Sequence, residues 1–205
     1  MTNDYLIKKV FHSYLLISIL AIMASTIGMI VDGIVIGQFL GEKCVSAFGF
    51  SGPVVILIAA LAGVFSNGGS SVFSNHVGRG DMGRIRLNFT VTCIGTLVIG
   101  ILFTVVSLFF SEPFARILGA EGELTALTAE YIRGFGAGGI FIMLSQVLLI
   151  YVRSDNSSVL GFVSVLVMTA VNITLDFVLG VALDLGMFGM GLATAVSYLA
   201  CMLIP

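Results

Sequence analysis

Six long, almost uncharged apolar runs dominate this 205-residue sequence. An α-helix needs ~20 apolar residues to cross the hydrocarbon core of a bilayer, and each run is close to or above that length. Strands of a membrane barrel would be about half as long and would alternate polar and apolar residues. The sequence therefore predicts an all-α, polytopic membrane protein that forms one six-helix unit over residues 1–205. The expected transmembrane helices cover residues 14–39, 53–73, 89–110, 132–151, 159–181 and 188–204.

The composition excludes a soluble domain. Hydrophobic residues make up 58% of the chain and charged residues only 10%, whereas an ordinary globular chain is about a quarter charged. A net charge of −2 gives no basic surface for nucleic acid. Cys44, Cys93 and Cys201 lie far apart, without the spacing of a metal or redox motif. We therefore expect the lipid bilayer as the surrounding medium, and neither a cofactor nor a nucleic-acid partner.

Basic residues between the runs indicate the orientation of the chain, because cytoplasmic loops are enriched in Lys and Arg. With the N-terminus in the cytoplasm, six basic residues fall on the inner side and three on the outer side. This bias predicts a multi-pass protein of the plasma (bacterial inner) membrane with a cytoplasmic N-terminus. The first run is too long for the core of a cleavable signal peptide. The inner residues are Lys8, Lys9, Arg79, Arg84, Arg86 and Arg153, and the outer ones are Lys43, Arg116 and Arg133.

Two further features leave alternatives open. The longest outer connection, residues 112–133, carries four glutamates and has Pro113 near its start. It is either a short helix at the membrane interface or a solvated acidic loop. Glycines are frequent in the fourth run, where Gly134, Gly136, Gly138 and Gly139 follow one another closely. Such residues either let neighbouring helices approach or loosen a helix that moves.

Asp32 and Asp176 are the ionisable residues that lie deep within the runs, where no Lys or Arg lies to pair with them; the one basic residue within the runs as drawn, Arg133, is at the outer edge of the fourth. A charged group inside a bilayer is costly, so each aspartate is a candidate functional residue. At a rise of ~1.5 Å per residue, Asp32 lies roughly 27 Å and Asp176 roughly 26 Å from the inner ends of their runs. The two carboxyl groups are therefore expected at one level, in the outer third of the membrane.

Two neutral polar residues are expected at the same level. Asn172 precedes Asp176 by one helical turn, and Thr194 lies about 9 Å below the outer end of its own run. Two carboxylates, an amide and a hydroxyl supply oxygen atoms that suit a proton or a hard cation such as Na⁺. The alternative is that these groups satisfy one another as polar contacts between helices. Tyr131 and Gln146 are weaker, accessory candidates, and Gln146 is as readily explained as a contact between helices.

Several motifs together resemble the multidrug and toxin extrusion (MATE) transporters, in particular their amino-terminal lobe. The order and spacing of these motifs, which cover nearly the whole chain, make the resemblance more specific than any one of them. The motifs are residues 30–37 (IVDGIVIG) followed by Leu40-Gly41, Pro53 at the start of the second run, residues 78–81 (GRGD), residues 153–155 (RSD), residues 172–176 (NITLD) and residues 186–194 (GMFGMGLAT).

The resemblance implies a function and a site. It implies one lobe of a secondary antiporter, coupled to H⁺ or Na⁺, that exports amphipathic and often cationic drugs or toxins. A second six-helix lobe, either a missing C-terminal half or a second copy, would complete the transporter. By motif, the family's cation site falls on Asp32, Asn172, Asp176 and Thr194, with Tyr131 as the candidate for an accessory tyrosine.

This sequence departs from the family in two ways, and rival functions stay open. Ile17 stands near the place of a helix-1 proline, and six runs replace the family's twelve. The rivals are a non-functional remnant and a flippase for lipid-linked sugars, which would need basic residues in its cavity. An intramembrane serine protease is disfavoured because His76 lies beyond the end of its run, away from Ser70 and Ser71. We therefore do not expect an enzyme.

Overall fold

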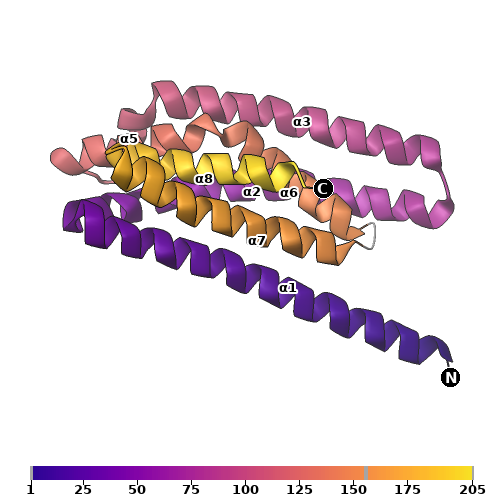
Figure 1. The fold of residues 1–205 in the computed structure, drawn as a ribbon. Helices are drawn as coiled ribbons and strands as arrows, with labels where there is room; N and C mark the ends of the chain where they lie inside the picture. The colour runs from indigo at the N-terminus through magenta and orange to yellow at the C-terminus, as the bar shows by residue number, and fades with distance from the viewer. Residues whose placement is uncertain (1, 155–156, 205) are drawn as a thin grey trace.

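The chain forms an all-helical bundle in the computed structural model, which describes the backbone of residues 2–154 and 157–204 (Figure 1). All regular elements within these residues are helices, so the all-α class predicted from the sequence is confirmed. The elements are α1 (Thr2–Val35), the π-helical segment η1 (Ile36–Leu40), α2 (Glu42–Arg79), α3 (Met82–Phe109), α4 (Ser111–Ile117), α5 (Glu123–Ala137), α6 (Gly139–Ser154), α7 (Ser158–Leu175), the π-helical segment η2 (Asp176–Ala182) and α8 (Gly186–Met202).

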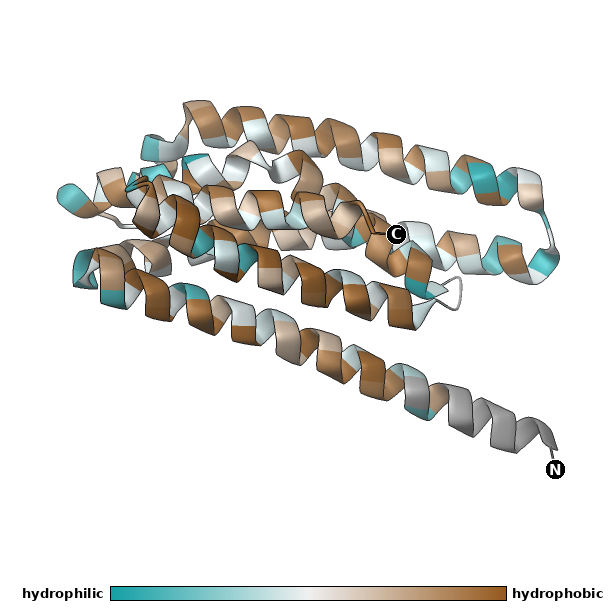
Figure 2. Cartoon of the chain, viewed as in Figure 1, coloured by the Kyte–Doolittle hydropathy of each residue, from teal (hydrophilic) through white to brown (hydrophobic). Residues whose placement is uncertain are grey.

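The lengths of the helices agree with a multi-pass membrane protein. In the described part of the chain, four helical segments are long and apolar enough to cross a bilayer, namely α1 with η1, α2, α3, and α7 with η2. The pair α5 and α6 makes a fifth if it is counted as one bent span. The 17-residue helix α8 is apolar but shorter. Figure 2 shows hydrophobic residues along the middle of the bundle and hydrophilic residues gathered mainly near its two ends.

The outer surface of the bundle is strongly apolar. Ile22 on α1, Val64 on α2 and Phe109 on α3 expose 65%, 71% and 76% of their surface. In water such a surface would drive association, whereas in a bilayer it contacts lipid chains at no cost. Fewer large hydrophobic side chains are fully buried in the protein core than are exposed on its surface; Ile58 and Met143 are among the buried ones.

Helix α8 lies at the centre of the bundle, between α5, α6 and α7, and α1 lies at its edge (Figure 1). Helix α1 packs mainly against α7, and it diverges from the other helices toward the N-terminus. The edge position of α1 leaves space between it and α2, and that space becomes part of the cavity described below.

The fourth predicted run, residues 132–151, spans two helices rather than one. Helices α5 and α6 meet at Gly138 and are bent by 53°. The glycines before and after the bend lie against neighbouring helices: a Cβ atom at Gly138 would lie 2.9 Å from the Ala195 Cα atom, and one at Gly139 would lie 2.8 Å from the Thr104 hydroxyl. Close packing between helices is therefore what these glycines provide.

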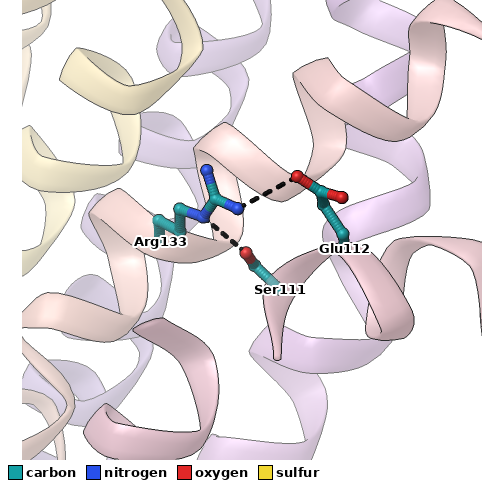
Figure 3. Close-up of polar contacts among 3 residues, drawn as sticks. All are labelled: Ser111, Glu112 and Arg133. Atoms are coloured by element: carbon teal, nitrogen blue, oxygen red, sulfur yellow. Dashed lines mark hydrogen bonds and ion pairs between the residues drawn. The ribbon is translucent and has the colours of Figure 1, made fainter. Parts of the chain in front are cut away.

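The outer connection, residues 112–133, is largely helical. Helix α4 lies at its start and α5 begins at Glu123. Figure 3 shows Arg133 of α5 reaching both Ser111 and Glu112 at the start of α4. The Nε atom of Arg133 donates to the Ser111 hydroxyl at 2.7 Å, and its Nη2 atom lies 3.2 Å from Glu112. Of the two alternatives for this segment, the structure thus shows the helix.

Candidate functional site

The two buried carboxyl groups belong to neighbouring helical segments. Asp32 lies in the last turn of α1, and Asp176 is the first residue of η2. Asp176 is completely buried, and Asp32 is 7% exposed. The two side chains are near enough for each to influence the charge of the other. Among the described residues, no donor reaches the Oδ1 atom of Asp32 or either carboxyl oxygen of Asp176. A hydrogen bond between the two carboxyl groups therefore requires a proton on one of them.

Each carboxyl group adjoins a π-helical segment. The segment η1 begins four residues after Asp32, and η2 begins at Asp176 itself. A π-helical turn is wider than an α-helical one and is frequent at functional sites. The η1 segment ends at Gly41, whose φ of +94° a residue with a side chain rarely adopts. The C-terminal end of α1 is thus shaped by backbone geometry that a uniform α-helix lacks.

Asn172 and Thr194 lie beside the carboxyl pair and bond to each other. The Asn172 side-chain nitrogen donates to the Thr194 hydroxyl at 3.4 Å, and that hydroxyl lies 3.3 Å from the Met190 carbonyl oxygen, to which it donates. The side-chain oxygen of Asn172 lies near Gly28 of α1: a Cβ atom added at Gly28 would be 3.9 Å from this oxygen. The structure therefore brings together the residues that the depth estimate placed at one level, while their role stays a prediction.

The two accessory candidates differ in position. Tyr131 of α5 is 3% exposed and lies beside Thr194. Its ring meets Phe48 edge-on at 5.2 Å and stacks on Phe135 at 6.1 Å between ring centroids. Gln146 is half-buried on α6 and is not one of the described residues that line the cavity beside the aspartates. Only Tyr131 is thus placed to contact a molecule in that cavity.

A cavity of about 550 Å³ opens beside Asp32, between α1, α2, α5, α7 and α8. Aromatic rings and methionines form much of its wall, including Met29, Phe48, Phe135, Met168 and Tyr198. Asp32, Asn172, Thr194 and Tyr131 line one end of it. The described lining contains Asp32 as its one charged residue and no Lys, Arg or His. This is an apolar pocket with a carboxyl group at one end.

The sequence reasoning missed the polar residues that line the rest of this cavity. These residues lie one or two helical turns before or after the predicted ones, on the same helix faces, and this spacing was a usable signal. Ser25 is two turns before Asp32, Thr169 is three residues before Asn172, and Ser197 and Tyr198 follow Thr194 by three and four residues. The α2 residues at the wall, such as Phe48 and Ser51, carry no such signal.

The set of oxygen atoms suits a monovalent cation or a proton better than a transition metal. No group of three or more His, Cys, Asp or Glu side chains is placed to hold a metal ion in the described part of the chain. The predicted ligands of a cation here are the carboxyl groups of Asp32 and Asp176, the amide oxygen of Asn172 and the hydroxyl of Thr194. Such hard, neutral and anionic oxygen ligands are those of Na⁺-like ions.

Comparison with known proteins gives one family and consistent relatives. The MatE family model matches residues 18–178. The multidrug export protein MepA of Staphylococcus aureus is 28% identical over 188 residues, covering 90% of this chain and 42% of MepA. MepA of Staphylococcus saprophyticus is 28% identical over 160 residues, covering 78% of this chain and 36% of that protein. The chain thus spans less than half the length of the curated relatives it matches.

Solved structures agree with this picture. An outward-facing multidrug resistance MATE family transporter of the MOP superfamily superposes with a TM-score of 0.87 at 26% identity, over 96% of this chain and 43% of that one. A MOP superfamily transporter from Pyrococcus furiosus, for which reverse polarity of the binding pocket suggests a different function, gives the same TM-score and identity over the same shares.

Proposed function

The chain belongs to the MatE family of multidrug and toxin extrusion transporters, and from this premise we propose that it is one lobe of a cation-coupled antiporter. In this proposal the lobe binds H⁺ or Na⁺ at the carboxyl pair. It binds amphipathic, often cationic, drugs or toxins in the adjoining cavity. Uptake of the coupling ion drives release of the substrate on the far side of the membrane.

The observation that carries this proposal is the pair Asp32 and Asp176 at the end of a cavity without basic residues. A buried negative charge without a partner is costly, so the pair needs a proton or a cation. Either one can arrive through the cavity, because Asp32 lines it. A site that must exchange one positive charge for another is the chemical requirement for antiport.

The form of the cavity supports an amphipathic organic cation as substrate. Its volume of about 550 Å³ is within the usual range for small-molecule sites. Aromatic faces such as Phe48 and Tyr198 attract both flat apolar groups and positive charge. The substrate and the coupling ion would compete for Asp32, so that binding of one favours release of the other.

A second six-helix lobe is part of the proposal, because the chain spans only 42% of the length of MepA. Alternating access requires two bodies that move relative to each other around a central site. The second lobe is either a C-terminal half or a second copy of this chain. We further propose a location in the plasma membrane with a cytoplasmic N-terminus, supported by the distribution of Lys and Arg.

The rival functions find less support. A flippase for lipid-linked sugars would hold an anionic head group, whereas the described cavity lining contains no cationic side chain. For a serine protease, Ser70 would need a histidine base. Its hydroxyl instead lies 2.8 Å from that of Ser154. A transporter, and not an enzyme, is what the family and the cavity support.

The decisive experiment measures how pH affects binding of rhodamine 6G, a cationic amphipathic dye, to the purified chain. Acidification should weaken binding in wild type, because protons occupy the carboxyl pair. Asp32→Asn and Asp176→Asn should each remove most of this dependence. Asp184→Asn is the matched control, because Asp184 is exposed outside the cavity and has a φ of +53°, which Asn tolerates. An unchanged pH dependence in both site variants would refute the mechanism.

Coupled transport is tested separately in proteoliposomes. A proton gradient and a Na⁺ gradient are imposed in turn. The gradient that drives dye efflux identifies the coupling ion. If the chain binds the dye but moves it under neither gradient, the second lobe is required for transport. If it neither binds nor moves the dye, the chain is a non-functional remnant.

A further inference from the structure

Four hydroxyl groups line the part of the cavity that lies beyond Asp32 toward the N-terminal end of α1. We call these Ser and Thr residues the hydroxyl subsite. Ser25 and Thr169 each lie seven residues before an aspartate, on α1 and α7, so both are displaced from the carboxyl pair in the same direction. Ser197 lies one turn beyond Thr194 on the oppositely directed α8. The members of the subsite are Ser25, Thr26, Thr169 and Ser197.

The protons of these four hydroxyl groups already have acceptors. Each hydroxyl donates to a backbone carbonyl oxygen of its own helix, three or four residues earlier. A serine or threonine in this arrangement keeps only its oxygen lone pairs for another molecule. The bonds run from Ser25 and Thr26 to the Ile22 carbonyl, both at 2.9 Å, from Thr169 to Val165 at 3.0 Å and from Ser197 to Thr194 at 2.7 Å.

Hydrogen-bond acceptors are also present at the end of the cavity that Asp32 lines. The amide nitrogen of Asn172 is bonded to Thr194, while its carbonyl oxygen and the Thr169 hydroxyl oxygen both lie next to Gly28 of α1. Asp32 lines the cavity as well, and its buried Oδ1 atom has no hydrogen-bond donor among the described residues. The hydroxyl subsite, Asn172 and Asp32 therefore supply acceptors along this wall, and the phenol groups of Tyr131 and Tyr198 add hydroxyls that can donate or accept.

We propose that the hydroxyl subsite binds the N–H groups of an organic cation, so that the cavity selects protonated amines, amidines and guanidines over quaternary ammonium compounds. This inference rests on the proposed function and specifies its substrate class. A primary ammonium carries three N–H donors that hydroxyl oxygens on α1, α7 and α8 can accept. A quaternary ammonium has the same charge and similar attraction to the aromatic rings, but it has no donor to offer.

The difference between the two cation types should be measurable. A hydrogen bond to a charged group contributes enough to change an affinity roughly 10-fold. A ligand that displaces water from the hydroxyl oxygens without replacing their hydrogen bonds loses that contribution. Charge, ring size and chain length can be kept equal by comparing 4-phenylbutylammonium with its N,N,N-trimethyl analogue. The ratio of their dissociation constants then reports the N–H groups.

The experiment titrates both compounds into the purified full chain at pH 7, where the amine is protonated. Wild type should bind the primary ammonium about 10-fold or more tightly than the trimethyl analogue. Thr169→Val removes one acceptor at nearly constant shape and should reduce this ratio several-fold, and Thr169→Ser should restore it. The matched control is Thr174→Val on the same helix, because the Thr174 hydroxyl makes the same type of bond, to the Ala170 carbonyl at 2.8 Å, but lies outside the cavity.

Two results would overturn the proposal: equal or tighter binding of the trimethyl analogue by wild type, or a ratio that Thr169→Val with Ser197→Ala leaves unchanged. These outcomes differ from failure of the proposed function, because they concern the ratio between two cations at one pH. A pH dependence of dye binding that stays unchanged in both Asp32→Asn and Asp176→Asn would refute the coupling mechanism and leave the ratio to be decided by the hydroxyl groups. An unchanged ratio with a normal pH dependence would refute the subsite alone.

Discussion

Gly191→Ala tests whether the contact between α5 and α8 sets the geometry of the candidate site. Gly191 faces the backbone of α5 directly: an added Cβ atom would lie 2.6 Å from the Phe135 nitrogen and 3.1 Å from the Gly134 carbonyl carbon, and it would meet the Tyr131 carbonyl oxygen. All three contacts are with backbone, so a change of side-chain rotamer cannot relieve them. The two helices must move apart, and Tyr131 must move away from Thr194.

The cost follows from this geometry. An ordinary contact of a Cβ atom is at least about 3.4 Å, so α5 and α8 must separate by close to 1 Å along their shared surface. Inserting one methyl group into such packing costs about 1–3 kcal/mol. For a chain of about 200 residues this lowers Tm by roughly 2–12 °C. Dye binding at the cavity should weaken as well, because Tyr131 and Thr194 line it from opposite sides of the contact.

Thermal unfolding of the purified protein, followed by far-ultraviolet circular dichroism in detergent, measures the effect. Gly68→Ala is the matched control, because Gly68 is helical and no atom lies within 4 Å of an added Cβ. That variant should keep or raise Tm, since alanine favours the helix over glycine. If Gly191→Ala unfolds within about 1 °C of both wild type and Gly68→Ala, the two helices are not held by backbone contact and the reasoning fails.

Two further predictions concern polar contacts away from the cavity. Tyr151→Phe should lower stability by about 1–3 kcal/mol in the same unfolding assay and leave dye binding unchanged. The Tyr151 hydroxyl lies 2.7 Å from the side-chain oxygen of Asn88 and 3.1 Å from the Thr92 hydroxyl, and both polar groups would lose this partner. A Tm equal to that of wild type would contradict this. Arg133→Gln should cost about 1 kcal/mol or less, because its bond to Glu112 is exposed, and should increase protease cleavage near α4; unchanged cleavage would show that Arg133 does not hold α4.

Counting residues from the ends of the apolar runs was sufficient to place Asp32, Asn172, Asp176 and Thr194 at one level. The count works because the rise of a helix is nearly constant and a bilayer fixes where each helix begins and ends. It gives no rotation about the helix axis, so it cannot tell which side chains of α2 face the cavity. Phe48 and Ser51 therefore had no signal in the sequence.

The breaks in the helices were also beyond the sequence pattern. Hydropathy reports where a helix lies, but a shift of the backbone hydrogen bonds by one residue changes no side chain. The π-helical segment η2 therefore begins within the fifth predicted run, residues 159–181, without any change in hydropathy that marks it. The bend at Gly138 has a visible cause in the run of glycines, but glycine alone does not distinguish a bend from close packing. At this position the chain has both.

In the proposed mechanism, the hydroxyl subsite and the carboxyl pair discriminate between the two cations in different ways. A proton binds a carboxylate covalently and needs nothing from Thr169 or Ser197. An organic cation is too large to sit between Asp32 and Asp176, of which the second is completely buried. It must neutralise Asp32 from the cavity side and obtain the rest of its affinity from acceptors and aromatic rings. Coupling requires that the two ligands favour different states. Protonation that draws the two carboxyl groups together, and a substrate that holds Asp32 toward the cavity, would provide that difference.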